Sequence, residues 1–378
     1  MAATRPIRVF HLCDKFGIRG ARTHGVSRLF SWWMPRFDRS FEVRLVGLRP
    51  EDDASAYLRR RGLDPICLGR GPHSPAVALD LLGLVRRERP HILHTHGFAT
   101  SNFARLVGRM TGVRVIVQEH AAFPSIPGYQ RVADRLLAPY TDLGIAVSES
   151  TKAFMVSHRH LPADRIQVVH NGAPLEEFRP PPPERIQAER DRLSLPPGAP
   201  VVGTVGRLDG QKGITFFLKA AAIVLGSRPD VRFLIAGDGP LLPQLQEEAR
   251  TLGIAERVLF AGFCEDVPLM QSLFDVQVFP SLWEGTPLTI FEAMAMRRPI
   301  VSTTADGLGE VLRQRHNALL VAPGDAAGLA AGVLELLEQP ALAGALAAQA
   351  GIDSGGYDVQ RTVDRLQELY LELMDRPR

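Results

Sequence analysis

Residues 280–292 read PSLWEGTPLTIFE and follow the short apolar run Val276–Phe279, which is typical of a buried strand. Prolines and a glycine then break the chain into a loop. Thr286 and Pro287 predict the start of a helix, with a hydroxyl side chain as N-cap and proline at the first helical position. A strand, a loop and a helix therefore follow one another, as they do in α/β proteins with a doubly wound parallel sheet.

Two carboxylates flank this predicted helix start. Glu284 is on the loop, and Glu292 is about two turns into the helix. The free N–H groups of a helix N-terminus favour anions, phosphate above all, whereas carboxylates accept hydrogen bonds from sugar hydroxyls. The pattern suggests a ligand with both kinds of group, such as a nucleotide sugar. A surface loop with one solvated glutamate and one glutamate on a helix face explains this stretch equally well.

Length and composition indicate a protein of two globular domains. A chain of 378 residues is too long for one ordinary core, and 45% hydrophobic with 22% charged residues is typical of a soluble protein. No run of about 18 uncharged apolar residues predicts a membrane-spanning helix, and the N-terminus shows no signal peptide. Cys13, Cys67 and Cys264 lack metal-ligand spacing, so a reduced, cytoplasmic compartment is expected.

The charge is distributed unevenly along the chain. Residues 1–170 contain 25 Lys and Arg against 14 Asp and Glu, whereas residues 171–378 contain 19 against 27. A basic first half predicts an anionic partner, for which nucleic acid, an anionic membrane surface and a phosphorylated lipid are the candidates. The alternative is a surface on which arginines are simply scattered.

Two of the three tryptophans, Trp32 and Trp33, are adjacent and lie among arginines. Aromatic side chains beside arginines can lie at a membrane interface. The alternative is that this segment packs into the core and that the arginine stems cover its outer side.

Strands and helices alternate through the first half, which predicts a parallel sheet with helices on both faces. Function is expected in the loops at the carboxyl ends of the strands, where His94, His96 and His120 lie. We expect His120 to be a polar group of the active site and His94 to be structural. No zinc site is expected, because neither paired cysteines nor an H-E-x-x-H motif is present.

A proline-rich segment, 173–200, predicts a linker, after which the α/β pattern restarts and ends in an amphipathic helix. The glycine-rich loops match neither the dinucleotide motif G-x-G-x-x-G nor the P-loop motif. A dinucleotide-dependent enzyme and a P-loop NTPase are therefore not expected.

Several short motifs, in order, resemble those of the retaining glycosyltransferases of family 4. These are Asn171-Gly172 with Phe178, Gly206-Arg207-Leu208 with Lys212-Gly213, Gly237-Asp238-Gly239-Pro240, Phe260 with Gly262-Phe263, and Glu284 with Glu292. The resemblance covers most of the second half and is looser in the first half. It implies the GT-B fold: two Rossmann-like, doubly wound domains that face each other across a cleft, with a C-terminal helix that crosses back to the first domain. The implied parts are an acceptor domain (1–172), the linker (173–200), a nucleotide-sugar donor domain (201–357) and the crossing helix (358–378).

The resemblance also implies roles for individual residues. Arg207 and Lys212 would hold the diphosphate, a role that suits cations facing a leaving group which gains negative charge. Glu284 would contact the transferred sugar, and His120 would lie near it. Further donor contacts would come from Gly20, Gly237, Phe263, Leu288, Thr289 and Glu292, of which Phe263 would read the base through its backbone and Glu292 would bind the ribose.

Three positions depart from the family pattern. Asp306 stands where a family loop before Glu310 has glycine, and Arg298 belongs to a stretch in which the family has a turn glycine. Around Gly20 the family start Gly-Gly-Ala-Glu reads Arg-Gly-Ala-Arg, which leaves the acceptor open.

The sequence therefore predicts transfer of a hexose from a UDP- or GDP-linked sugar to an acceptor hydroxyl with retention of configuration. The expected pathway is polysaccharide, lipopolysaccharide or glycolipid synthesis. The expected acceptor is lipid-linked or a saccharide, and the expected location is the cytoplasm, with peripheral contact at the inner face of an anionic membrane. No metal or other cofactor is expected, because no Asp-x-Asp occurs, and no nucleic acid partner is expected. A sugar-nucleotide epimerase, a phosphorylase-like enzyme and a non-catalytic partner subunit are the alternatives.

Overall fold

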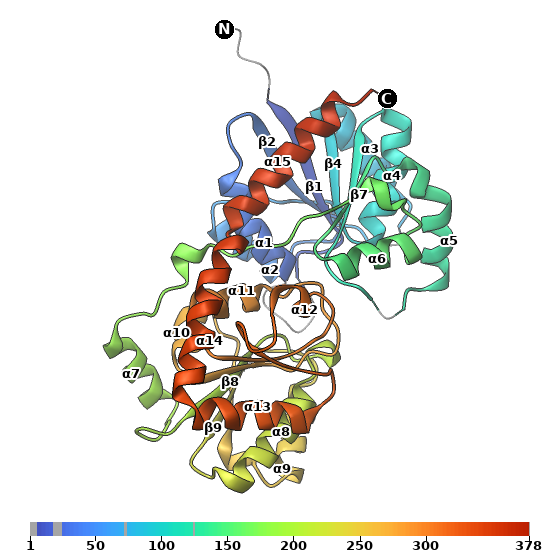
Figure 1. Cartoon of the computed structure of the whole chain (residues 1–378). Coiled ribbons are helices and arrows are strands. Elements are labelled where there is room, and N and C mark those ends of the chain that lie inside the picture. Colours follow the sequence, from blue (N-terminus) through green and yellow to red (C-terminus); the bar gives the residue numbers. More distant parts are fainter. Residues whose placement is uncertain (1–5, 18–24, 72–73, 124, 378) are drawn as a thin grey trace. The chain divides into compact units, whose positions relative to one another are not determined.

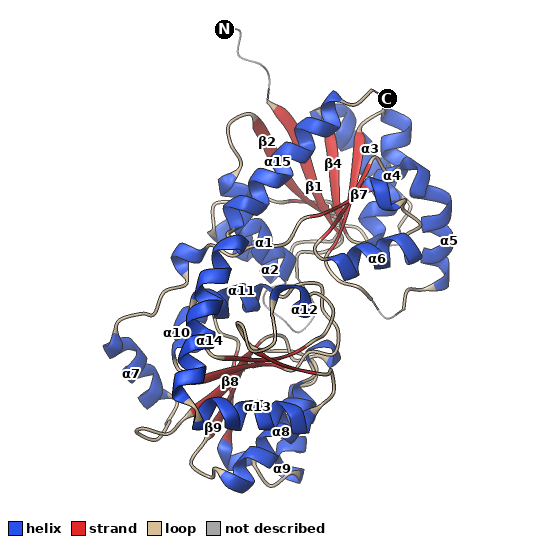
Figure 2. Ribbon diagram, in the orientation of Figure 1, coloured by secondary structure: helices blue, strands red, loops and turns tan. Residues whose placement is uncertain are grey.

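The computed structural model describes residues 6–17, 25–71, 74–123 and 125–377. The chain forms two compact units, one of Met1–Asn171 with Val359–Arg378 and the other of Gly172–Asp358. Each has its own parallel sheet with helices packed around it (Figure 1; Figure 2). The two doubly wound Rossmann-like units predicted from the sequence are confirmed.

The sheet of the first unit has seven strands in the order β3-β2-β1-β4-β5-β6-β7, all of them parallel. The sequence reasoning missed the two-residue edge strand β3. The bounds are β1 Ile7–Cys13, β2 Phe41–Gly47, β3 Ile66–Cys67, β4 Ile92–His96, β5 Arg114–Glu119, β6 Leu143–Ala146 and β7 Ile166–Val168.

Helices connect these strands, and some begin at side-chain caps that the sequence provides. Asp52 and Ser55 form a reciprocal capping box at the start of α2, and Ser148 caps α6. The C-terminal helix α15 packs in this unit, as predicted. The bounds are α1 Gly25–Trp33, α2 Asp53–Arg60, α3 Ala76–Glu88, α4 Phe98–Thr111, α5 Gly128–Leu137, α6 Glu149–His158 and α15 Val359–Asp375.

The two faces of the first sheet have different linings because successive strand residues point to opposite faces. On β1, Phe10 and Leu12 join the apolar core that α3, α4 and α6 complete. Between them, His11 points to the opposite face, where its ring meets Trp33 of α1 and Tyr370 of α15. That face carries a buried polar cluster instead of a purely apolar core.

The second unit has a six-stranded parallel sheet in the order β10-β9-β8-β11-β12-β13. Its core is apolar and includes Phe217 of α8, Phe233 of β9 and Leu329 of α13. The strands are β8 Val201–Val205, β9 Arg232–Ala236, β10 Val258–Gly262, β11 Val276–Phe279, β12 Ile300–Thr303 and β13 Leu319–Val321. The helices are α7 Pro183–Arg192, α8 Ile214–Ser227, α9 Leu242–Thr251, α10 Val267–Ser272, α11 Leu288–Ala295, α12 Leu308–Val311, α13 Ala326–Glu338 and α14 Pro340–Asp353.

The segment 173–200, predicted as a linker, contains a helix and belongs to the second unit. Its proline run ends where Pro183 opens α7, since proline is compatible with the first turn of a helix. Ile186 and Leu195 then pack against a small apolar cluster that includes Met270. Only the first part of the segment, before α7, is proline-rich connecting chain.

Among the described residues, no single helix is both long enough and apolar enough to cross a membrane. The pair Ala326–Glu338 and Pro340–Tyr357 passes that test together, but the two helices are bent by 104°. Both contribute side chains to the core of the second unit, Leu329 and Leu346 among them, which accounts for their apolar composition.

Candidate functional site

The loop after β8 contains the first pair of predicted donor residues. Asp209 accepts a hydrogen bond from the backbone N–H of Lys212 (3.3 Å), which closes a short 3-10 turn at Gly210–Lys212. The same carboxylate accepts a hydrogen bond from Nε of Arg207 at 2.5 Å. The guanidinium of Arg207 is therefore fixed at the carboxyl end of β8, although it remains partly exposed.

Lys212 and Glu284 form an ion pair across the ends of β8 and β11. Nζ of Lys212 lies 2.5 Å from Oε1 of Glu284. Ser281 donates to the same oxygen (2.8 Å), and Gln211 donates to Oε2 (3.0 Å). Glu284 is only 3% exposed, so these donors compensate its loss of water and fix its position.

The Glu284 loop is held from its other side by the loop after β12. The carboxylate of Asp306 accepts a hydrogen bond from the backbone N–H of Glu284 at 3.0 Å. Gly307 lies so close to this loop that a Cβ there would meet the carbonyl oxygen of Gly285 at 1.6 Å. Asp306, which departs from the family pattern, is therefore a structural support of the Glu284 loop.

A small pocket lies between the ends of β8 and β11 and the start of α11. Its lining residues are Thr204, Val205, Gly206, Lys212, Ile214, Phe279, Pro280, Ser281 and Thr289. Lys212 and the first turn of α11 thus line one hollow. A cation beside a helix N-terminus is an arrangement that binds phosphate groups.

Helix α11 begins one residue later than predicted. Pro287, expected at the first helical position, is the N-cap, and Leu288 is the first residue of the helix. The prediction that the Thr286 hydroxyl is the N-cap is therefore wrong. Because proline has no side-chain acceptor, it leaves the first N–H groups of α11 without a cap from the N-cap residue.

The remaining predicted donor residues, apart from Gly20, lie in the same unit. Glu292 is fully buried within α11, and Leu288 is 9% exposed at the helix start. Phe263 directly follows β10. Gly237 has φ +152° and lies against the Gly206 loop, where a Cβ would meet the carbonyl oxygen of Gly206 at 1.8 Å. Only glycine permits these two loops to approach so closely.

His120, in contrast, lies in the first unit, just after β5. Its Nε2 is 2.9 Å from Nδ1 of His96 on the neighbouring strand β4. Burial lowers the pKa of His120 to about 4, so its ring is neutral at physiological pH. His94 is buried and bonded through Nδ1 to the hydroxyl of Tyr370 at 2.7 Å. Gly20 lies outside the described residues.

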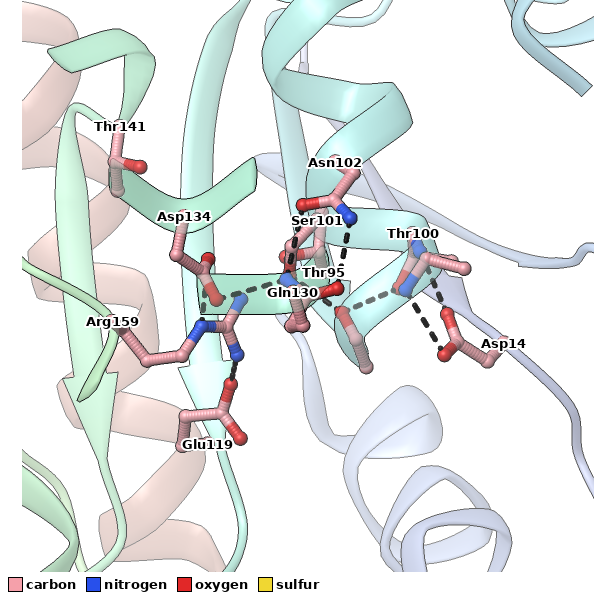
Figure 3. A network of polar contacts seen from close by, with 12 residues as sticks. Asp14, Thr95, Thr100, Ser101, Asn102, Glu119, Gln130, Asp134, Thr141 and Arg159 are labelled. Atoms are coloured by element: carbon pink, nitrogen blue, oxygen red, sulfur yellow. Dashed lines mark hydrogen bonds and ion pairs between the residues drawn. The ribbon is translucent and has the colours of Figure 1, made fainter. Parts of the chain in front are cut away.

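A buried ionic network supports the same end of the first sheet (Figure 3). Arg159, at the end of α6, forms ion pairs with Glu119, which precedes His120, and with Asp134 of α5. Arg105 of α4 pairs with the same Asp134 at 2.6 Å. All four charged groups are almost completely inaccessible to solvent. This network joins α4, α5 and α6 to the end of β5 and so orients the segment that carries His120.

The membrane interpretation of Trp32 and Trp33 is wrong. Both rings are buried, with 3% and 0% of their surface exposed. Trp33 instead forms part of the aromatic wall around the histidines of the first unit, with its ring 6.4 Å from that of His11. The sequence shows aromatic residues beside arginines. It does not show which side of α1 is covered by α15 and the sheet.

Sequence reasoning missed the partners that position Glu284, namely Gln211, Ser281 and the carboxylate of Asp306. Gln211 and Ser281 lie within or beside the recognised motifs, so their position was a usable signal. No sequence signal marked the ionic network, because its members are distant in sequence and belong to different helices.

The described residues also include one grouping of possible metal ligands. His11, His94 and His96 each offer a ring nitrogen, and these nitrogens lie within 4.8 Å of one another. Two of these nitrogens, Nδ1 of His11 and Nε2 of His96, lie 2.9 Å apart.

Comparisons with known proteins agree with the geometry of both units. The family model described as Glycosyltransferase Family 4 matches residues 24–177, and that described as Glycosyl transferases group 1 matches residues 199–339. The chain is 30% identical over 312 residues to the alpha-D-kanosaminyltransferase of Streptomyces kanamyceticus, covering 76% of this chain and 79% of that protein. It is 26% identical over 306 residues to the UDP-Gal:alpha-D-GlcNAc-diphosphoundecaprenol alpha-1,3-galactosyltransferase of Escherichia coli, covering 78% and 79%.

Solved structures share the fold over nearly the whole chain. HepE of Anabaena, crystallised in complex with UDP, superposes with a TM-score of 0.84 at 19% identity and covers 97% of this chain and 100% of its own. The sucrose-phosphate synthase of Thermosynechococcus elongatus superposes with a TM-score of 0.78 at 18% identity, covering 97% and 99%.

Proposed function

The chain belongs to the group 1 glycosyltransferases of family 4, and from this premise we propose that it transfers a hexose from a nucleotide-diphosphate sugar to an acceptor hydroxyl with retention of configuration. The observation that carries the proposal is the pocket in which Lys212 meets the first turn of α11, with Glu284 held beside it. This arrangement offers an anion site next to a fixed hydrogen-bond acceptor, which are the two kinds of group that a sugar diphosphate needs.

In this proposal the diphosphate lies against Lys212 and the N–H groups of Leu288 and Thr289. Arg207 adds a second cation at the end of the same strand. These groups stabilise the negative charge that the leaving diphosphate gains in the transition state. The absence of an Asp-x-Asp motif from the sequence supports this use of side-chain cations. The Escherichia coli relative is named for UDP-Gal, and HepE was crystallised with UDP, which favours a UDP-linked donor.

The transferred sugar would donate hydroxyl hydrogen bonds to Glu284, whose carboxylate is already oriented by Lys212, Gln211 and Ser281. Glu292 would bind the ribose, and the backbone near Phe263 the base. For retention we propose attack from the face that the diphosphate leaves. The bond from the anomeric carbon to the phosphate oxygen breaks, the acceptor oxygen bonds to the same face, and the acceptor proton passes to the leaving phosphate.

We propose that the acceptor lies at a membrane, because helix α5 turns polar side chains toward the protein and apolar side chains toward solvent. Its inner face is polar, with Gln130 and Asp134 buried in the ionic network. Its outer face exposes Tyr129, Val132 and Leu136, which are 62%, 60% and 67% accessible. An apolar face turned to solvent is unusual for a helix that packs on a sheet.

Further basic and apolar side chains are exposed on α5 and α4. Arg131 and Arg135 are exposed on α5 beside the apolar residues. Met110 and Arg109 are exposed at the C-terminal end of α4, where the guanidinium of Arg109 lies 5.9 Å from the ring of Tyr140, just after α5. Apolar groups interleaved with arginines fit the interface of an anionic bilayer, where each cation contributes about 1 kcal/mol. The lipid diphosphate acceptor in the name of the Escherichia coli relative supports the same choice.

A thermal shift measurement with UDP, GDP and ADP, alone and as sugar conjugates, tests the donor site. Ligand at about 100 times its dissociation constant adds roughly 2.7 kcal/mol of stability, and we expect this for one nucleotide only. The reaction is then followed with that donor, and release of nucleoside diphosphate is the expected product. Release of sugar phosphate would favour a phosphorylase-like enzyme. The absence of a shift with every nucleotide contradicts the donor site.

Vesicle sedimentation tests the α5 surface. We expect the protein to bind vesicles that contain phosphatidylglycerol and to bind neutral phosphatidylcholine vesicles far less. The double variant Val132→Asp with Leu136→Asp should lose this binding, whereas Ile352→Asp, at a 69% exposed position of the second unit, should retain it. Equal sedimentation of the double variant and the wild type contradicts this surface.

A further inference from the structure

Three histidines of the first unit lie on one face of the sheet because of strand geometry. His94 and His96 are two residues apart on β4, so both point to the same side. His11 of β1 is the register partner of His94 and points to that side too. His120 follows β5, and Tyr370 of α15 covers the group from outside the sheet.

Four hydrogen bonds join these five side chains in one line. Nε2 of His120 lies 2.9 Å from Nδ1 of His96, and Nε2 of His96 lies 2.9 Å from Nδ1 of His11. Nε2 of His11 lies 3.1 Å from the hydroxyl of Tyr370, which lies 2.7 Å from Nδ1 of His94. At the two ends, Nδ1 of His120 and Nε2 of His94 are buried and make no hydrogen bond of normal geometry to the described residues.

The surroundings keep these groups neutral. Phe30, Trp33 and Phe37 surround the ring of His11 at 5.8 to 6.4 Å. Burial lowers the pKa of His11 to about 3 and that of His94 and His96 well below its usual value. Burial also raises the pKa of Tyr370 well above its usual value, so the phenol keeps its hydrogen.

Neutral groups in such a line constrain one another. A neutral imidazole has one N–H and one bare nitrogen, and a phenol donates one hydrogen while its oxygen accepts another. If His120 donates through Nε2 to His96, then Nε2 of His96 must carry the hydrogen that His11 accepts. In the same way, Nε2 of His11 must then donate to the oxygen of Tyr370, and the hydroxyl of Tyr370 must donate to Nδ1 of His94. Both printed hydrogen bonds of the Tyr370 hydroxyl belong to this line, so its hydrogen finds an acceptor there only if it is donated to His94 or to His11. Two arrangements then satisfy all four bonds: every ring carries its hydrogen on Nε2, or every ring carries it on Nδ1.

The two arrangements differ in the direction in which the hydrogen bonds run. With every hydrogen on Nε2, Tyr370 donates to His94 and Nδ1 of His120 is bare. With every hydrogen on Nδ1, Tyr370 donates to His11 and Nδ1 of His120 carries a hydrogen.

We propose that His94, Tyr370, His11 and His96 are positioning residues which couple the tautomer of His120 to their own, so that all four rings carry their hydrogen on the same nitrogen. Tyr370 thereby connects the C-terminal helix α15 to the tautomer of His120. An interaction of Nδ1 of His120 with a substrate hydroxyl rests on the proposed glycosyltransferase function. The shared tautomer of the four rings does not depend on that function.

A metal held by His11, His94 and His96 is the competing explanation. Two nitrogens on a tetrahedral zinc ion at about 2.0–2.1 Å are about 3.3 Å apart, and both must direct lone pairs at the ion. Nδ1 of His11 and Nε2 of His96 are 2.9 Å apart and bonded to each other. The observed geometry therefore favours the hydrogen-bonded line.

Nitrogen-15 NMR of histidine-labelled protein without ligand tests the proposal, because ring nitrogens with and without hydrogen differ widely in chemical shift. The four rings are assigned by replacing the other seven of the 11 histidines one at a time. We expect all four to carry hydrogen on the same nitrogen. Mixed tautomers, or ring shifts of a bound metal that a chelator reverses, would each overturn the proposal.

Two variants separate this role from a merely structural one. Tyr370→Phe removes the hydroxyl, so His94 is uncoupled and a second tautomer should appear among the four rings, with a several-fold loss of kcat. Phe37→Leu keeps the hydroxyl but removes the ring that stacks on Tyr370 at 6.1 Å, and it should retain the shared tautomer. Unchanged tautomers in Tyr370→Phe overturn the proposal. If the four rings of the wild-type protein share one tautomer but the protein has no transferase activity, only the proposed function is refuted.

Discussion

Nζ of Lys212 lies 2.5 Å from Oε1 of Glu284, so the cation assigned to the diphosphate and the carboxylate assigned to the sugar hold each other in place. Lys212 is 20% exposed at its side chain and Glu284 is 5% exposed. A partly buried pair with further hydrogen bonds is much better fixed than a surface ion pair. The two groups thus provide a preorganised site in which neither needs to be ordered when the donor binds.

Replacement of Lys212 by alanine is predicted to reduce turnover far more than donor affinity. In the proposed role the ammonium stabilises charge that develops mainly in the transition state, and loss of one such group typically lowers kcat about 10²–10³-fold. Steady-state kinetics and nucleotide titration measure the two effects separately. Lys219→Ala, at an exposed position of α8, is the matched control and should be active. Full turnover in Lys212→Ala would falsify its role at the leaving group.

Gly307→Ala is predicted to damage the donor site, whereas Gly309→Ala is predicted to be tolerated. A Cβ at position 307 would meet the carbonyl oxygen of Gly285 at 1.6 Å and push the Glu284 loop away. At position 309 the nearest atom would be 3.6 Å from the Cβ, which is ordinary contact. Overpacking of this kind costs about 1–3 kcal/mol. Thermal unfolding and activity of both variants check the prediction, and equal behaviour of the two would contradict it.

The sequence predicts which residues form the candidate donor site but not the contacts among them. Lys212 and Glu284 were identified from separate motifs, and β8 and β11 bring them together as neighbouring strands. Gln211 and Ser281 reach Glu284 because β8 and β11 are neighbours, and a sequence motif does not show which strands are neighbours. Asp306 was considered a departure from the pattern, yet its carboxylate binds the Glu284 backbone.

Features that depend on distant packing could not be predicted. The alternation of strand residues places His94 and His96 on one face, but Tyr370 is separated from His94 by 276 residues. Trp33 was open to a membrane interpretation because the sequence does not show what covers its helix. The N-cap of α11 was misplaced by one residue, since both Thr286 and Pro287 are compatible with a helix start.

Arg159→Met is predicted to destabilise the first unit strongly. The substitution leaves Glu119 and Asp134 in a buried position with one cation fewer, and loss of one partner from a buried ion pair costs about 3–5 kcal/mol. Arg192→Met is the matched control, because Arg192 pairs with Glu189 at the surface with its side chain 61% exposed. That control should change the free energy of unfolding by less than about 1 kcal/mol. Urea denaturation compares the two variants, and a similar loss in both would contradict a special role for the buried network.

Stability is predicted to fall as the pH decreases below about 7. Burial lowers the pKa of His11 to about 3 and of His120 to about 4, and that of His94 and His96 well below the usual value. In the unfolded chain these rings have a pKa of about 6.5. Between these values the unfolded state binds more protons than the folded state, so protons favour unfolding.

The free energy of unfolding is therefore highest above a pH of about 7, and it falls progressively as the pH decreases from about 6.5 towards 4. Each ring contributes a slope of up to about 1.4 kcal/mol per pH unit in this range. Denaturant unfolding at intervals between pH 5 and pH 8 measures the slope. His316→Gln is a suitable control, because His316 lies 3.2 Å from Asp353 in the second unit and its side chain is 41% exposed. A free energy of unfolding that is constant from pH 5 to pH 7 would show that the histidines are not buried as neutral rings.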